Sequence, residues 1–187
     1  LEIQGWWDKK IQELSKGMAQ KIQFVVTVLH NPKLLILDEP FSGFDPVNAN
    51  LIKDEIIELN KKGTSVIFST HRMESVEEMC DYIALIHKSN KLIVGKLDDV
   101  KRQHRTNIYQ VGIITNNIEG LMVSLTHKFT IGQTNFKSLN DDLKLEVHLE
   151  NHSSNELISI LTQFGQVTHF VEKIPTVNDI FIQTVSQ

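Results

Sequence analysis

Apolar residues in the first part of the chain follow two periods, one helical and one strand-like. After Ser15, a residue type favoured at helix N-caps, apolar side chains recur at helical spacing until Asn31-Pro32, where a helix must end. The continuous apolar run Leu34–Leu37 follows directly and predicts a short strand that is covered on both faces. The pattern therefore begins as a helix that leads into a buried strand.

The same alternation continues beyond the first strand. Asp45 predicts the cap of a helix whose first residue is Pro46, and Lys62-Gly63 predicts its end. Further elements are expected in the order strand, helix, strand and strand at residues 65–69, 75–80, 82–87 and 92–94. Strands that alternate with helices are typical of a parallel α/β sheet.

The pattern changes near Arg105. Six elements follow in the order strand, helix, strand, strand, helix, strand, at residues 108–114, 118–127, 129–136, 143–149, 153–164 and 167–174. This order is that of a ferredoxin-like unit. A last helix is expected after a cap at Thr176. We therefore predict two domains, residues 1–104 with an α/β fold and residues 105–187 with a small α+β ferredoxin-like fold.

Two adjacent carboxylates, Asp38 and Glu39, stand where the strand over residues 34–37 ends. The carboxyl ends of parallel strands line the crevice in which such sheets bind ligands. There one carboxylate can hold Mg²⁺ while its neighbour orients an attacking water. A charged strand end that leads into a turn is the structural alternative, but the preceding apolar run and the following Ser-Gly-Phe-Asp-Pro turn favour the functional interpretation.

Two further segments carry candidate phosphate chemistry. Ser15 and Gly17 place a hydroxyl and exposed amides at a helix N-terminus, which favours an anion. His71 follows the strand over residues 65–69 and can donate a hydrogen bond to a phosphate. A lone histidine after a strand is usually structural, but its position one helix and one strand after Asp45 favours a role in the site.

Three ordered segments together resemble the second half of an ABC-type ATPase cassette: Leu14-Ser15-Lys16-Gly17-Met18, the run Leu35–Pro46, and Ser69-Thr70-His71. The resemblance implies a partial P-loop NTPase sheet flanked by helices over residues 1–104. It makes Asp38 the Walker B aspartate that holds the metal, Glu39 the catalytic glutamate and His71 the H-switch histidine. ATP and Mg²⁺ are the implied ligands.

The first segment is similar to the ABC signature motif, usually L-S-G-G-Q. Lys16 replaces its first glycine and Met18 its glutamine, whereas Ser15 and Gly17 are kept. The resemblance implies that these four residues contact the nucleotide held by a second ATPase subunit, and Lys16 would add positive charge there. It also makes Asp45 the named residue of a D-loop, which lies at that subunit interface in the family.

Partners and location also follow from the resemblance. It implies a second ATPase subunit, transmembrane permease subunits and a place at the inner face of the cell membrane. The end of the chain, Val177-Asn178-Asp179-Ile180-Phe181, is similar to the accessory domain of drug-, sodium- or gliding-type bacterial ABC exporter ATPases. Trp6-Trp7 lies where the family's helical subdomain ends, but core packing is the commoner fate of such a pair.

No G-x-x-x-x-G-K-[ST] phosphate loop occurs in the 187 residues. We therefore expect that the chain is a fragment of a longer ATPase and that it binds ATP poorly by itself. The alternative is a non-catalytic partner module that supplies only the signature face to a complete subunit. A third interpretation is a soluble ABC-type ATPase of DNA repair or translation, and the missing coiled-coil heptads and the acidic balance count against it.

Composition narrows these alternatives. The net charge is −4 and the sequence pI is about 6.1, so a nucleic-acid partner has no basic field to bind. The basic stretch 101–105 is more typical of a solvated helix end. Cys80 is the only cysteine, which fits a reducing compartment, and no histidine pair has metal-binding spacing.

Overall fold

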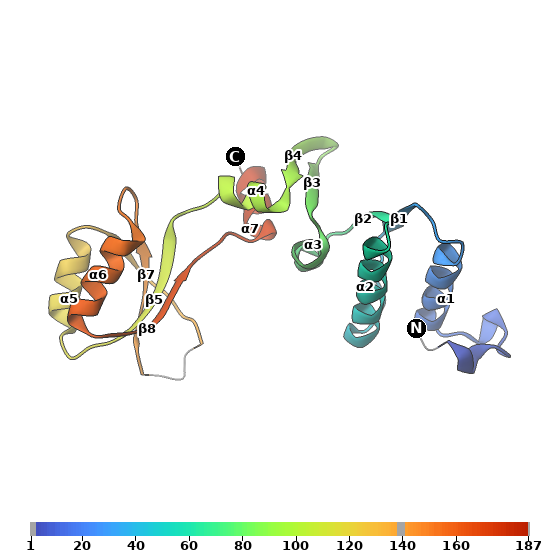
Figure 1. The fold of residues 1–187 in the computed structure, drawn as a ribbon, viewed down its shortest axis with the longest axis horizontal. Coiled ribbons are helices and arrows are strands. Elements are labelled where there is room, and N and C mark those ends of the chain that lie inside the picture. Colours follow the sequence, from blue (N-terminus) through green and yellow to red (C-terminus); the bar gives the residue numbers. More distant parts are fainter. Residues whose placement is uncertain (1–2, 138–140, 187) are drawn as a thin grey trace. The chain divides into compact units, whose positions relative to one another are not determined.

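The computed structural model describes residues 3–137 and 141–186, and the chain divides into two compact units, Leu1–Asp81 and Tyr82–Gln187 (Figure 1). Within the described residues, no helix combines the length and the apolar character needed to cross a membrane. The domain boundary predicted after residue 104 stays a prediction.

Among the residues that the structure describes, the first unit contains one parallel strand pair and three α-helices. After two 3-10 turns, its elements are α1 (Lys16–Val28), β1 (Leu34–Asp38), α2 (Pro46–Lys61), β2 (Ser65–Ser69) and α3 (Met73–Met79). Strands β1 and β2 pair in parallel, with Leu34 opposite Ser65 and Asp38 opposite Ser69. The helix after Ser15, the helix that starts at Pro46 and the strand over residues 65–69 are thus confirmed.

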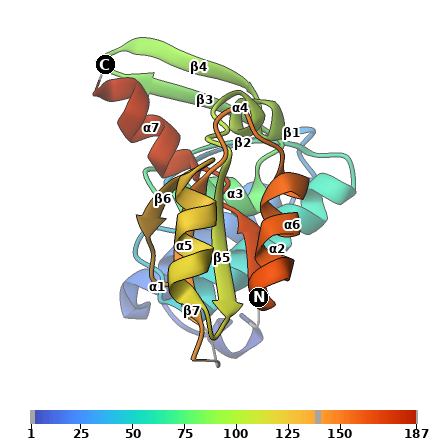
Figure 2. The ribbon, with the colours of Figure 1, turned by 90° about the vertical axis from the view of Figure 1, so that its left-hand side faces the viewer.

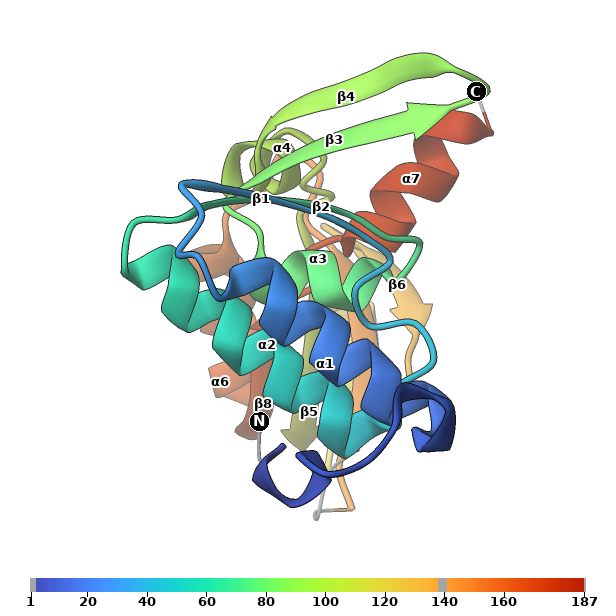
Figure 3. The ribbon, with the colours of Figure 1, turned by 90° about the vertical axis from the view of Figure 1, so that its right-hand side faces the viewer.

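Helices α1 and α2 lie on one face of the strand pair (Figure 3). Leu35 of β1 is buried, and the core of this unit consists of Phe24, Phe41, Ala49, Ile52 and Ile56. Leu34, Ile36 and Ile67 are exposed on these strands. The expectation that the strand over residues 34–37 is covered on both faces is therefore wrong, because successive side chains point to opposite faces and only one face meets the helices.

The tryptophan pair also departs from the expectation of core packing. Trp6 ends the 3-10 turn Gln4–Trp6 and is half-buried, with the Lys21 ammonium 5.8 Å from its ring centroid. Trp7 is 86% exposed. The prediction is wrong for Trp7, because in a tight turn consecutive side chains point in different directions and only one of them reaches α1.

The second unit opens with an antiparallel hairpin, β3 (Tyr82–His87) and β4 (Asn90–Lys96). Its turn residues Lys88 and Ser89 both have positive φ, as the favoured two-residue hairpin turns require. Residues 82–87 form a strand as predicted, but their partner is the next strand along the chain and not the parallel pair. Helix α4 (Leu97–Gln103) follows, and the basic stretch after residue 100 is its end.

The rest of this unit is a four-stranded antiparallel sheet. Its elements are β5 (Ile108–Ile114), α5 (Ile118–Thr126), β6 (Thr130–Gln133), β7 (Leu143–His148), α6 (Ser154–Phe164), β8 (Gln166–Glu172) and α7 (Val177–Val185). The strand order β6-β7-β5-β8 places the first and third strands of this sheet, β5 and β7, at its centre. The predicted ferredoxin-like unit and the α/β class are confirmed, although β6 is shorter than predicted.

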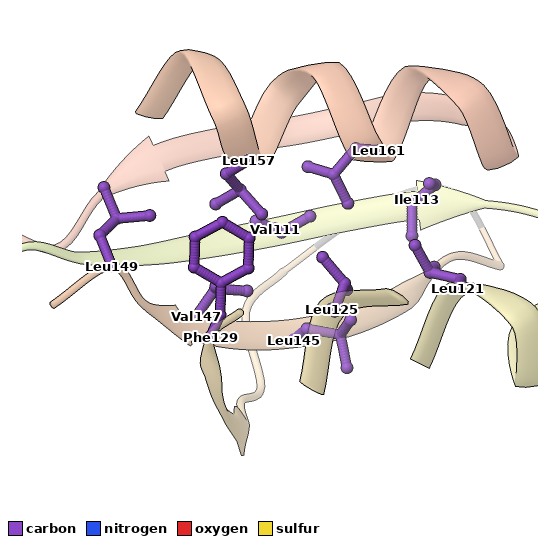
Figure 4. Close-up of a cluster of buried hydrophobic side chains, with 10 residues drawn as sticks. All are labelled: Val111, Ile113, Leu121, Leu125, Phe129, Leu145, Val147, Leu149, Leu157 and Leu161. Carbon is purple, nitrogen blue, oxygen red and sulfur yellow. The ribbon is translucent and has the colours of Figure 1, made fainter. Parts of the chain in front are cut away.

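Helices α5 and α6 cover one face of this sheet (Figure 2). Figure 4 shows the side chains that fill the space between them: Val111, Ile113, Leu121, Leu125, Phe129, Leu145, Val147, Leu149, Leu157 and Leu161. The strand residues in this cluster are two apart, which is the alternation that the sequence shows around residues 143–149. A continuous apolar core therefore holds this sheet and its two helices together.

Replacing a residue of this core with alanine should destabilise the protein. Leu121 is fully buried, so we expect Leu121→Ala to lower the free energy of unfolding by about 2–5 kcal/mol. Val123 lies on the same helix and is 69% exposed, so Val123→Ala should change it by less than about 0.5 kcal/mol. Urea denaturation followed by circular dichroism measures both, and equal effects would contradict the assigned core.

Candidate active site

The candidate site lies where β1 and β2 end. Their parallel register sets Asp38 beside Ser69, and the Ser69 hydroxyl donates a hydrogen bond to the Asp38 carboxylate. The next backbone amide, that of Glu39, donates to the Ser69 carbonyl oxygen at 3.0 Å. Two segments about thirty residues apart in sequence are thereby held at one edge of the unit.

Glu39 is the centre of this group. Its Oε1 accepts hydrogen bonds from the His71 backbone amide at 2.9 Å and from His71 Nδ1 at 2.7 Å. Its Oε2 accepts from the Thr70 hydroxyl at 3.2 Å. The structure therefore brings together two of the predicted catalytic residues. It also places the hydroxyls of Ser69 and Thr70 at the site. The sequence pattern did not indicate these two residues except by their position just before His71.

The environment of Glu39 favours its charged form. Partial burial by itself raises the pKa of Glu39, but the hydrogen bonds from His71 and Thr70 together outweigh burial and hold that pKa below its ordinary value. A carboxylate can only accept, so Nδ1 of His71 must carry the proton of their shared hydrogen bond. Glu39 is therefore an ionised acceptor at neutral pH.

Asp38 is the candidate metal ligand. Its carboxylate stands at the strand end beside the Ser69 hydroxyl, so oxygen donors meet there. Mg²⁺ prefers oxygen ligands and usually takes one or two protein carboxylates together with phosphate oxygens and water. The donor set at this position therefore fits Mg²⁺.

Asp45 caps helix α2, as predicted. Its Oδ1 accepts from the backbone amides of Val47 and Asn48, both at 3.0 Å. The hydrogen bond from the Asn48 amide is the main reason that the pKa of Asp45 lies below its ordinary value. Gly43 has φ +79°, a conformation that glycine adopts without strain. Capping and turn geometry explain both residues, and a further role for Asp45 stays a prediction.

The signature-like residues form the start of α1. Ser15 is its N-cap and accepts from the Met18 amide at 3.3 Å, and Lys16 and Gly17 are the first two helical residues. One turn further on, Gln20 Nε2 donates to the Ser42 carbonyl oxygen at 2.9 Å. Gln20 was missed by sequence reasoning, although its place four residues after Lys16 puts both on one helix face.

Two family models match the chain. Residues 95–185 match the model described as the C-terminal domain of DrrA1-3-like ATP-binding proteins. Residues 10–77 match an AAA domain model whose description also names an AbiEii toxin of type IV toxin–antitoxin systems. The first match covers the ferredoxin-like unit, and the second covers the carboxylates and His71.

Proteins named as ABC transporter ATP-binding proteins match almost the whole chain. An uncharacterized ABC transporter ATP-binding protein of Alkalihalophilus pseudofirmus is 40% identical over 177 residues, which are 95% of this chain and 63% of the relative. One of Bacillus subtilis is 39% identical over 183 residues, 98% of this chain and 59% of the relative. The chain thus spans about three-fifths of the length of these relatives.

A solved structure titled "Structure of ATP binding subunit of ABC transporter" is 36% identical, with a TM-score of 0.47 over 50% of this chain and 39% of that one. The sequence matches carry the assignment. They show that the chain is similar to ATP-binding cassette proteins. The chain is related to the ABC transporter ATP-binding proteins, and its C-terminal part to the corresponding domain of DrrA-like members. The resemblance drawn from the motifs is confirmed.

The His71 side chain should set the protonation of Glu39. A lowered folded-state pKa contributes stability above the ordinary pKa of a glutamate, and this contribution is lost as the pH falls through the lowered value. His71→Ala removes one of the hydrogen bonds, so the pKa of Glu39 should rise. Carboxyl NMR titration measures it. His30→Ala, at an exposed histidine of the same unit, is the control, and an unchanged Glu39 titration in His71→Ala would contradict the assigned contact.

Proposed function

We propose that the protein is the ATP-binding and ATP-hydrolysing subunit of an ABC transporter, which powers a separate membrane permease. The observation that carries this proposal is the convergence of Asp38, Glu39 and His71 at the ends of β1 and β2. It is supported by sequence relatives that are named ABC transporter ATP-binding proteins.

The geometry supports a proposed role for each of these residues. Asp38, with the Ser69 hydroxyl beside it, would hold Mg²⁺, which neutralises phosphate charge when bound. Glu39 is ionised and accepts hydrogen bonds, so it can orient a water for attack on the terminal phosphate. Because Nδ1 of His71 is directed at Glu39, its Nε2 is left for the phosphate, and it can donate there when the imidazole is protonated.

The signature turn would act on a second nucleotide. Ser15 and Gly17 stand at the start of a thirteen-residue helix, where backbone amides and the helix dipole favour an anion. Lys16 adds a cation to this turn, and Met18 takes the place of a glutamine. We propose that these residues cap the ATP held by a partner ATPase subunit, with Asp45 at the same interface and the pair at the inner face of the membrane.

The phosphate cradle is the part of the machinery that these 187 residues do not carry. Without a G-x-x-x-x-G-K-[ST] motif there are no loop amides or lysine to hold the β- and γ-phosphates. We therefore propose that residues 1–187 alone bind MgATP weakly and do not hydrolyse it.

A non-catalytic partner module is the second candidate. It would need only the signature turn, which stands at an exposed helix start. Glu39 and His71 count against it, because they are held together by two hydrogen bonds that a purely signature-supplying module does not need.

Loss of the Glu39 carboxylate should distinguish a catalytic ATPase subunit from a non-catalytic partner module. In the natural protein that carries these residues, we expect Glu39→Gln to lower steady-state MgATP hydrolysis by about 10²- to 10⁴-fold while ATP binding is kept, because an amide is a poor base for the attacking water. Glu74→Gln, at an exposed carboxylate of α3, should leave the rate unchanged. If Glu39→Gln hydrolyses ATP as fast as the wild type, Glu39 has no catalytic role and the partner module is favoured.

A further inference from the structure

We infer that Gln20 is a positioning residue that links the signature turn to Glu39 through the backbone of Ser42. This inference rests on the proposed function, because it assigns the two ends of the link to two different nucleotides. Its observations are two hydrogen bonds and one close packing contact within the first unit.

The first step joins α1 to the loop after β1. Ser15 and Gln20 belong to the same end of α1, the one as N-cap and the other within its second turn. The side-chain amide of Gln20 donates from Nε2 to the Ser42 carbonyl oxygen at 2.9 Å. Only the nitrogen of that amide can donate to a carbonyl, so this contact fixes which way the amide faces.

The second step joins the loop to the catalytic residue. The Ser42 backbone amide donates to the Glu39 carbonyl oxygen at 3.0 Å and closes a tight turn. Ser42 thus uses both of its backbone groups, its carbonyl with Gln20 and its amide with Glu39. In the inferred link, these two bonds connect the position of α1 to the residue that would orient the water.

Packing keeps the link in place. Gly43 follows Ser42 with φ +79°, and a Cβ built there would lie 3.2 Å from Gln20 Oε1 and 3.3 Å from Lys16 Cε. The two α1 side chains therefore rest against this turn. Within the part of the chain that the structure describes, Gln20 Oε1 is buried and has no hydrogen-bond partner. A flip of this amide would place Oε1 against the Ser42 carbonyl oxygen, so the Nε2 donor keeps its place there.

The consequence is a coupling within one chain. Under the proposed function, Ser15 contacts the nucleotide of the partner subunit while Glu39 serves the nucleotide of its own. The Gln20–Ser42–Glu39 link therefore connects the two sites of a dimer. Groups along such a link change the coupling between two sites by roughly 2- to 30-fold.

Two substitutions of Gln20 remove its hydrogen bond to Ser42 and differ in the charge and shape that they leave. Gln20→Glu keeps the shape but removes the donor, and Gln20→Met removes the donor without adding charge. Gln23→Glu and Gln23→Met are the matched controls, because Gln23 is an exposed glutamine on the same helix. In the natural ATPase, both Gln20 variants should lower kcat about 2- to 30-fold with KM for ATP nearly unchanged. A Hill coefficient above one should fall toward one.

A second readout does not depend on ATP hydrolysis. In amide NMR spectra of this chain, both Gln20 variants should move the signals of Ser42 and Glu39, whereas the Gln23 variants should not. Unmoved Glu39 signals, or kinetics in the Gln20 variants that match the Gln23 controls, would overturn the link. A wild-type protein without ATPase activity would contradict the proposed function instead, while the NMR comparison would still test the contact.

Discussion

The parallel register of β1 and β2 is the constraint on which the site depends. Asp38 lies opposite Ser69, so the residues that follow each strand, Glu39 and Thr70-His71, necessarily meet. A shift of one residue would turn the Asp38 side chain to the other face and separate Glu39 from its donors. The helices α1 and α2 stabilise this register by covering Leu37, Val66 and Phe68 from one side.

The contacts between the two strand ends also hold a strained backbone conformation at Glu39. Glu39 has φ +45°, a region in which a residue with a side chain costs on the order of 1–3 kcal/mol. The conformation is held by the hydrogen bond to the Ser69 carbonyl, the turn to Ser42 and the donors of His71 and Thr70. We interpret this as preorganisation, because these contacts fix the direction of the Glu39 carboxylate and keep it ionised.

Much of this was predictable from the sequence, for identifiable reasons. Caps such as Ser15 and Asp45 act locally, so α1 and α2 begin where their sequences indicate. The six ferredoxin-like elements were predictable from strict alternation and helical stripes. The open face of β1 and the exposure of Trp7 were not, because each depends on whether another element covers the residue. Gln20 was not predictable either, since its partner Ser42 lies in a loop whose path sequence periodicity does not set.

The account stands on the claim that Asp38, Glu39 and His71 surround the terminal phosphate of MgATP. The most direct measurement is a crystal structure of the natural ATPase with MgADP and vanadate, which mimics the phosphate in transfer. We predict Asp38 at the metal, directly or through one water, and the Glu39 carboxylate within hydrogen-bond distance of the apical oxygen, with His71 at an equatorial one. Vanadate held by other residues, with the Glu39 carboxylate out of hydrogen-bond distance of its apical oxygen, would contradict the account.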